Sequence, residues 1–500
     1  MESSESKGKE LTLEEIQNFK GKYPKQLWYL ALVEMWERFC FYGMRGMLAV
    51  FMVNEFLYSD QEASLKYGAI QAFVYAFTFV GGIFADRILG FKKSLTFGAI
   101  MMIAGNFFVA FSPHNFFFLG ITLVIIGTGF FKPNISSMVG QLYKDGDNRK
   151  DAGFGLFYTA INVGALIGGV ACVILGKSYS WSLAFLAAGI VMIIGLVVFL
   201  LTKKHLGPIG DTPLKALTAN KRKFREIIVY IGALLTIPLI FLMINNTDYT
   251  DIFMYTVGPL ALLYFIVQTI KIKDNKARKK LLAALILISF SILFFAFFEQ
   301  AGGSLALFAN KNLSHALLFF NVDPNAVNNG ANSVFVILLS TPLGLLWLWL
   351  AKRKKEPNTV IKFGLGFLFV AIAFYVFYSI AFSADSNGIG SMNIFVLAYL
   401  FMTIGELCLS PIGLSMVTSL SPKHLSGMMM GLWFLASAYG QYVAGLLGAG
   451  IASPDPNASK MDSLIAYTSG YHQLAIYAVI IGVVLIILSP LIRKLMQEVK

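Results

Sequence analysis

Seven ionisable residues fall inside long apolar stretches of this chain, where few charged side chains are expected. They are Glu34, Glu37, Arg38, Arg45, Lys132, Glu299 and Glu406. An ionised side chain costs at least ~2.5–3.5 kcal/mol at the centre of a membrane helix, so each of these must face a partner or a water-filled cavity. Four acids against three bases leave one negative charge in excess. Groups of this kind can bind a charged ligand and exchange protons, and this is the chemistry that we expect of them.

The charged residues nearest the N-terminus share one face of a helix. Glu34, Glu37 and Arg38 are separated by three and four positions, and Tyr42 and Arg45 continue the same face. An internally neutralised structural cluster does not require four charges on one helix. We therefore interpret this stripe as the working centre of the protein.

The other three charges need partners from elsewhere in the chain or from a ligand. Lys132 precedes Pro133, which frees a backbone carbonyl in the middle of a helix, and the carboxylates available to Lys132 in its half of the chain are Glu34 or Glu37. Glu299 and Glu406 have no base on their own helices. Their partners must come from across a cavity or be the ligand itself.

The elements that position these residues are membrane helices. The sequence is 57% hydrophobic and only 13% charged, which excludes an ordinary soluble protein. Apolar runs of ~20 residues, enough to cross the hydrocarbon core of a bilayer, occur about 14 times. Runs this long and continuous must be helices, since barrel strands would be shorter and alternating. We predict an all-α integral membrane protein with about 14 transmembrane helices.

Basic residues predict the orientation of these helices. With the N-terminus inside, most of the 40 Lys and Arg residues fall in cytoplasmic segments, so we predict an N-in, C-in topology. The net charge of +13 then reflects the membrane topology and does not indicate nucleic-acid binding. Residues 1–25 lack the apolar core of a signal peptide, so we expect the first span to be the insertion signal. Thr12 and Glu15 have the spacing of a capping box and suggest a short amphipathic helix, with a frayed tail as the alternative.

The basic stretch after the sixth span divides the chain. Two six-helix halves joined by a basic linker match the major facilitator architecture, in which the substrate site lies at the midplane and the halves rock. Gly82–Arg87 and the Gly90–Lys93 that follows resemble a conserved cytoplasmic loop of that superfamily. Residues 303–331 are polar and are expected to form an outside loop that holds a short helix. The predicted divisions are a cytoplasmic tail 1–25, a six-helix bundle 26–201, a cytoplasmic linker 202–225, two inserted helices 226–273 and a second six-helix bundle with a short cytoplasmic tail 274–500.

Neither enzyme nor metal chemistry is indicated. The three cysteines lie within apolar runs and the five histidines are scattered, so no metal-ligand spacing exists in the sequence. Ser410 beside Glu406 is the nearest candidate nucleophile, but no histidine or lysine is placed to activate it. We expect no catalytic residue, no metal and no cofactor.

Four motifs in sequence order resemble those of one family, the proton-coupled oligopeptide transporters (POT, also PTR2) of the major facilitator superfamily. Residues 34–43 are similar to its ExxERFxYYG signature, and residues 131–134 to its FKPN motif. Residues 157–164 are similar to FYxxINxG, and residues 405–415 to GELxxSPxGLS. Bacterial members also have two extra helices between the halves. The resemblance covers essentially the whole chain.

The resemblance implies a bacterial-type symporter that imports di- and tripeptides by alternating access across the cell (inner) membrane, driven by the proton gradient and functioning as a monomer. It assigns the peptide carboxylate to Arg38 and Lys132, and the peptide amine to Glu406. Coupling and gating are assigned to Glu34 and Glu37 with Lys132, and to Glu299 with its partner Arg45. The remaining implied substrate-binding residues are Tyr42, Tyr75, Asn162, Asn332, Trp433 and Ser437.

Two positions depart from the family pattern. Phe41 replaces the first tyrosine of its signature and lacks a hydroxyl near the substrate, and Ser333 follows Asn332 where the family shows proline, so that helix should be less kinked. The main alternative is a major facilitator transporter of another small solute, such as an amino acid, nitrate or a drug. An exporter of lipophilic cations does not account for Arg38, Arg45 and Lys132, and a receptor would bind without accumulating its ligand.

Overall fold

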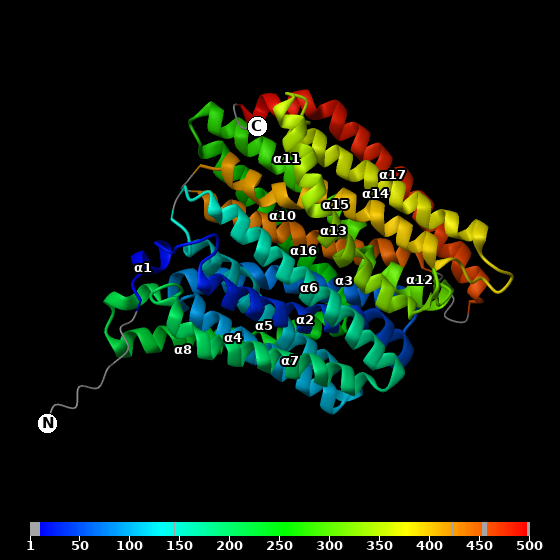
Figure 1. Cartoon of the computed structure of the whole chain (residues 1–500), viewed down its shortest axis with the longest axis horizontal. Coiled ribbons are helices and arrows are strands. Elements are labelled where there is room, and N and C mark those ends of the chain that lie inside the picture. Colours follow the sequence, from blue (N-terminus) through cyan, green and yellow to red (C-terminus); the bar gives the residue numbers. More distant parts are fainter. Residues whose placement is uncertain (1–10, 145, 423–424, 453–457, 498–500) are drawn as a thin grey trace. The chain divides into compact units, whose positions relative to one another are not determined.

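The computed structural model describes residues 11–144, 146–422, 425–452 and 458–497, and almost all of them are helical. The helices of the first part are α1 (Leu13–Gln17), α2 (Lys25–Glu55), α3 (Asp60–Phe84), a π-helical turn (Ala85–Leu89), α4 (Phe91–Phe111), α5 (Pro113–Gln141), α6 (Arg149–Ser178), α7 (Trp181–Thr202), α8 (Ala219–Leu235), α9 (Ile237–Asn245) and α10 (Thr247–Lys271). The others are α11 (Asn275–Phe298), α12 (Ser304–Asn312), α13 (Pro324–Lys352), α14 (Thr359–Ser379), α15 (Met392–Leu420), α16 (Ser426–Ile451) and α17 (Lys460–Met496). One small hairpin pairs β1 (Ala316–Leu317) with β2 (Phe320–Asn321). The all-α prediction is confirmed (Figure 1).

The number of long apolar helices also agrees with the prediction. Within the described ranges, 13 helices are long and apolar enough to cross a membrane, with α8 and α9 forming one of them and α11 and α12 another. The 31-residue α2 is not among these, because it carries the stripe Glu34, Glu37, Arg38 and Arg45. Adding α2 brings the total to the predicted ~14 spans.

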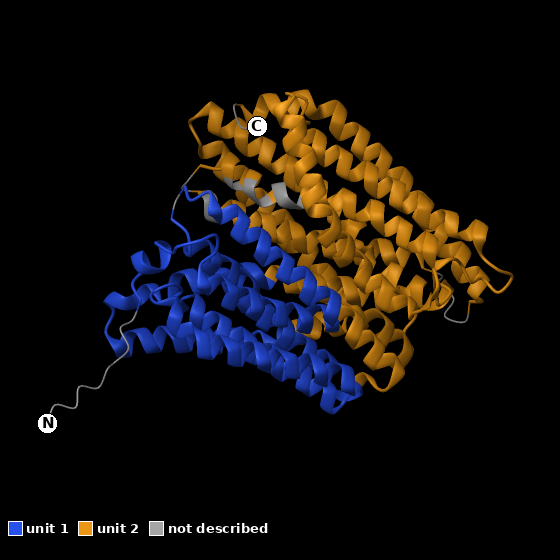
Figure 2. Cartoon of the chain, in the orientation of Figure 1, with its two compact units in different colours: residues 1–43, 77–168, 182–239 blue, residues 44–76, 169–181, 240–500 orange. Residues whose placement is uncertain are grey.

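The chain divides into two compact units, coloured separately in Figure 2. Unit 1 holds residues 1–43, 77–168 and 182–239, and unit 2 holds residues 44–76, 169–181 and 240–500. The borders fall inside α2, α3, α6, α7 and α9. The stripe on α2 is therefore shared between the units. The predicted bundles 26–201 and 274–500 follow the connectivity of the chain, and they stay a prediction.

Glycines let helices approach closely inside each unit. In unit 1, a β-carbon at Gly98 would overlap the carbonyl oxygen of Gly127, which places the backbones of α4 and α5 in direct contact. In unit 2, Gly366 and Gly405 do the same for α14 and α15. Small residues at such crossings are typical of membrane helices, where close van der Waals packing replaces the hydrophobic effect.

The predicted N-terminal helix is present as α1. The Thr12 side chain accepts a hydrogen bond from the Glu15 backbone, and the Glu15 carboxylate accepts one from the Thr12 backbone at 2.7 Å. This reciprocal capping box satisfies two amides at the start of a very short helix. The alternative of a frayed tail is therefore wrong for this segment.

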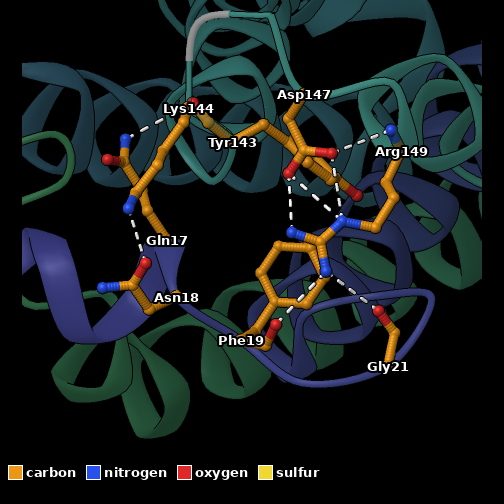
Figure 3. Close-up of polar contacts among 8 residues, drawn as sticks. All are labelled: Gln17, Asn18, Phe19, Gly21, Tyr143, Lys144, Asp147 and Arg149. Atoms are coloured by element: carbon orange, nitrogen blue, oxygen red, sulfur yellow. Dashed lines mark hydrogen bonds and ion pairs between the residues drawn. The ribbon is translucent and has the colours of Figure 1, made fainter.

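The chain after α1 is fastened to the α5–α6 turn within unit 1 (Figure 3). Gln17 donates to the backbone carbonyl of Gln141 at 3.0 Å. The Arg149 guanidinium lies 3.9 Å from the ring centroid of Phe19 and donates to the Phe19 and Gly21 carbonyls. Hydrogen bonds from Arg149 also lower the pKa of Asp147 below its usual range. These contacts hold the segment between α1 and α2 against the turn before α6.

The short helix expected within the outside loop 303–331 is present, but the predicted end of this loop is wrong, because the next helix begins before residue 331. Residues 304–312 form α12, and α13 already begins at Pro324. Asp323 caps α13 by accepting hydrogen bonds from the amides of Asn325 and Ala326. The Asn329 side-chain amide donates to the Asn325 carbonyl at 2.9 Å, so an asparagine that suggests a loop is accommodated within the helix.

Candidate functional site

A fully buried charge cluster lies on α2 in unit 1. Glu34, Glu37 and Arg38 are 2%, 0% and 2% exposed. The Arg38 Nε atom lies 3.0 Å from Glu34 Oε1, and the same guanidinium forms an ion pair with Glu37. One arginine therefore pairs with two carboxylates. These three side chains together carry one net negative charge when all of them are ionised.

Lys132 and Phe41 complete this cluster. The Lys132 ammonium interacts electrostatically with both Glu34 and Glu37. The Phe41 ring centroid is 5.4 Å from the Arg38 guanidinium and 6.0 Å from Lys132 Nζ, so the ring takes part in two cation–π contacts. Phe41, which departs from the family signature, thus has no hydroxyl, and its aromatic ring contacts both cations.

The cluster retains open hydrogen-bonding capacity. Glu34 Oε2 and Glu37 Oε1 are buried, and neither has a hydrogen-bond partner in the described part of the chain. A buried carboxylate oxygen without a donor is costly when ionised, and it is a favourable position for a proton. The local arrangement can therefore bind and release protons.

Helix α6 packs directly on the helix that carries the cluster. A β-carbon at Gly164 would overlap the Met35 carbonyl oxygen and lie 3.0 Å from Arg38 Cβ, and one at Gly168 would overlap the backbone of Phe39. Asn162, two positions before Gly164, is buried and donates to the carbonyl of Tyr158 at 2.9 Å. The glycine of the motif 157–164 is thus required by its close approach to α2.

Replacing Gly164 by alanine should separate α6 from α2. The added methyl group has to push back a backbone carbonyl, and overpacking of this kind costs about 1–3 kcal/mol. All three cysteines are buried, so thermal unfolding can be followed through their reaction with a thiol dye. The matched control is Gly155→Ala on the same helix, where a β-carbon would meet nothing within 4 Å. Equal unfolding temperatures for the two variants would contradict the close packing.

Unit 2 contains the predicted partner of Arg45. Arg45 forms an ion pair with Glu299 and also donates from Nε to the Tyr67 hydroxyl at 2.7 Å. Glu299, 4% exposed, begins the short 3₁₀ turn Glu299–Gly302 that connects α11 to α12. A β-carbon at Gly302 would overlap the Tyr67 hydroxyl, so this turn and α3 are also in contact. The pair joins α2 to the turn that follows α11, and both of its side chains are largely inside the unit.

Glu406 lies in a second polar group of unit 2. Its Oε2 atom accepts a hydrogen bond from Asn332 Nδ2 at 2.8 Å, and Asn332 also contacts the Thr403 hydroxyl at 3.2 Å. Asn332 is therefore bound to the predicted amine-binding carboxylate. Helix α13 continues through Asn332 and Ser333 as one α-helix.

The remaining predicted residues are distributed over both units. Trp433 is buried with its ring against Gly413, and Ser437 donates its hydroxyl to the Trp433 carbonyl at 3.1 Å. Tyr42 is half-buried in unit 1, where its ring meets that of Phe41. Tyr75 is half-buried in unit 2. Unit 1 thus holds Glu34, Glu37, Arg38, Tyr42, Lys132 and Asn162, and unit 2 holds Arg45, Tyr75, Glu299, Asn332, Glu406, Trp433 and Ser437.

Tyr67 was not among the predicted residues, although its spacing from other polar residues could have indicated it. Tyr67, Gln71 and Tyr75 are four residues apart on α3, so a polar face runs along a helix that is otherwise apolar. Two ion pairs of unit 2 were also missed: Lys177 with Asp323 at 2.6 Å, and Lys311 with Asp60 at 2.7 Å. In each pair the acidic partner lies far from its lysine in the sequence.

Among the described residues, no three His, Cys, Asp or Glu side chains gather as metal ligands. The side chain of Ser410, the nearest candidate nucleophile, lies outside those that the structure describes.

Known proteins resemble this chain over nearly its whole length. The sequence model described as "PTR2: POT family" matches residues 92–461. The chain is 34% identical to the peptide transporter YePEPT of Yersinia enterocolitica subsp. palearctica serotype O:3 (strain YE-P4), covering 95% of this chain and 96% of that protein. It is 31% identical to dipeptide and tripeptide permease B of Aliivibrio fischeri (strain MJ11), with the same two shares covered. The crystal structure of a peptide transporter POT in complex with sulfate matches with a TM-score of 0.83 and 31% identity, covering 98% of this chain and 100% of that chain.

Proposed function

Because the chain belongs to the POT family of multi-pass membrane transporters with the major facilitator fold, we propose that it imports di- and tripeptides together with protons. Transport proceeds by alternating access across the cell (inner) membrane. The names of its relatives, a peptide transporter and a dipeptide and tripeptide permease, support this substrate class.

The observation that carries the proposal is the buried ion pair of Arg45 with Glu299. A buried acid–base pair is stable only while both partners are charged. One proton on Glu299 removes its charge, so the attraction between the two charges of this pair is lost. Protonation therefore weakens the connection between α2 and α11, which is the step that couples the proton to a change of conformation.

The substrate roles follow the charges of a peptide's termini. Arg38 and Lys132 hold the carboxylate, and Glu406 with Asn332 holds the amine. A transporter of peptides with variable side chains must bind these invariant termini through electrostatic interactions. Tyr42, Tyr75, Asn162, Trp433 and Ser437 contact the rest of the substrate.

The driving force is sufficient for accumulation. One pH unit supplies ~1.4 kcal/mol per proton, and a charge moved through 100 mV supplies ~2.3 kcal/mol. One proton per peptide therefore supports more than tenfold accumulation.

Uptake of labelled dialanine into proteoliposomes tests the proposal. We expect accumulation with an inward proton gradient and only equilibration without one. Dipeptides and tripeptides should compete with the label, whereas single amino acids, nitrate and cationic drugs should not. Accumulation that ignores the proton gradient would contradict proton coupling, and competition by amino acids or nitrate alone would favour the alternative substrate classes.

A further inference from the structure

A cavity of about 860 Å³ opens in unit 1 among the start of α4, the start of α8 and the segment that joins α7 to α8. Six cationic side chains line it: Lys92, Lys93, Lys203, Lys204, Lys215 and Arg222. Helices α4 and α8 run side by side here (Figure 1), and the rings of Phe97 and Tyr230 lie 4.9 Å apart. None of the residues assigned to peptide or proton transport lines this cavity.

The positive charge of the cavity exceeds what its own acids neutralise. Asp211 accepts from Lys92 and Lys215, each at 2.8 Å. Burial alone would raise the pKa of Asp211, but these hydrogen bonds outweigh burial and hold it below its usual range, so Asp211 is ionised. The second carboxylate, Glu226, pairs with both Lys93 and Arg222, and its Oε1 atom lies 2.7 Å from Lys93 Nζ.

Two of the cations remain available for a ligand. Lys203 and Lys204 are exposed at the end of α7, and neither has an ion pair within the described residues. Since two carboxylates face six cations, the cavity keeps a clear positive excess that favours an anion.

The backbone around the cavity is held in place before any ligand arrives. Lys92 donates from its amide to the Gly210 carbonyl at 2.9 Å, and Thr212 donates to the Ile88 carbonyl at 2.7 Å. Gly90 has φ +76°, and a β-carbon there would be strained and would lie 2.5 Å from the backbone of Asp211. The segment 207–212 is therefore fixed against the turn before α4.

One wall of the cavity is apolar and continues along the membrane-facing helices. Phe97 and Ile100 of α4 and Tyr230 of α8 form this wall, and Ile100 is 46% exposed. Further along α8, Ile227 and Ile231 are also exposed. A ligand with an anionic head and hydrocarbon chains matches this combination, whereas a free anion would leave the apolar wall unused.

We propose that this cavity binds an anionic phospholipid, with its phosphate at Lys203, Lys204 and Arg222 and its acyl chains along Phe97, Ile100 and Tyr230. The predicted topology places these helix ends in the cytoplasmic leaflet. Basic pockets between membrane helices on that side are suited to phosphate-bearing headgroups. The site is independent of the proposed peptide and proton roles.

Native mass spectrometry of the detergent-purified full chain, titrated with phosphatidylglycerol or phosphatidylcholine, tests this site. We expect one phosphatidylglycerol to be retained in preference to phosphatidylcholine. The double variant Lys203→Gln/Lys204→Gln should weaken its retention roughly 25-fold, since each cation contributes about fivefold. The matched control is Lys354→Gln/Lys355→Gln, which removes an exposed lysine pair at the end of α13 and should leave retention unchanged.

Three results would overturn the proposal. These are equal retention of the two lipids, equal losses in both double variants, and complete displacement of the lipid by inorganic phosphate at millimolar concentration. The last result would identify a site for free anions. If the double variant does not purify, Lys204→Glu serves in its place, and thiol labelling of the buried cysteines checks that the variant is folded.

Discussion

Replacing Glu299 by glutamine should abolish proton-driven peptide accumulation while peptide exchange across the membrane continues. Glutamine keeps the shape of the side chain and resembles its protonated form, so the ion pair with Arg45 is permanently lost. The variant can bind and release peptide, but a proton no longer changes the strength of this contact. With a gradient of one pH unit, we expect about tenfold accumulation for the natural protein and none for the variant.

Uptake and counterflow in the same proteoliposomes separate these two activities. Glu62→Gln is the matched control, because Glu62 is an exposed carboxylate on α3 that pairs with Lys66 at 3.6 Å. It should retain both activities. Accumulation by Glu299→Gln under a proton gradient would exclude Glu299 as the coupling site, and loss of exchange as well would assign it to substrate binding or folding.

Replacing Arg38 by methionine should destabilise the protein and eliminate peptide uptake. Arg38 forms ion pairs with both Glu34 and Glu37, and all three are buried. Removing one partner of a buried ion pair typically costs ~3–5 kcal/mol, because the other charge is left uncompensated. The thermal unfolding temperature, followed by thiol labelling, should fall accordingly.

A quadruple variant distinguishes a structural role of this cluster from a functional one. Arg38→Met and Lys132→Met combined with Glu34→Gln and Glu37→Gln removes all four charges, so most of the lost stability should return. Uptake should stay absent, since the groups proposed for carboxylate binding and proton transfer are gone. The control is Arg353→Met, which changes an arginine that stacks over Trp349 at the end of α13. Proton-driven uptake by the quadruple variant would show that the cluster is only structural.

The architecture could be predicted from the sequence because membrane helices are encoded locally. Each apolar run is long enough to span a bilayer, and its backbone must form hydrogen bonds within the same segment. Even α1 could be predicted, because its capping box joins residues only three positions apart. The boundary at 303–331 failed for the opposite reason. Asn325 and Asn329 suggest a loop, but Asp323 caps α13 and the Asn329 amide donates to a backbone carbonyl within that helix.

The site shows the same division between local and distant information. The sequence by itself determined the stripe of charges on α2 and the motifs that identify the family, because both depend on spacing within single segments. Only the tertiary structure decided that Phe41 faces Lys132 as well as Arg38, and that Tyr67 supports the pair of Arg45 with Glu299. These partners come from other helices. A sequence shows which charges need a partner, but it does not show which distant side chain will be brought to them when the helices pack.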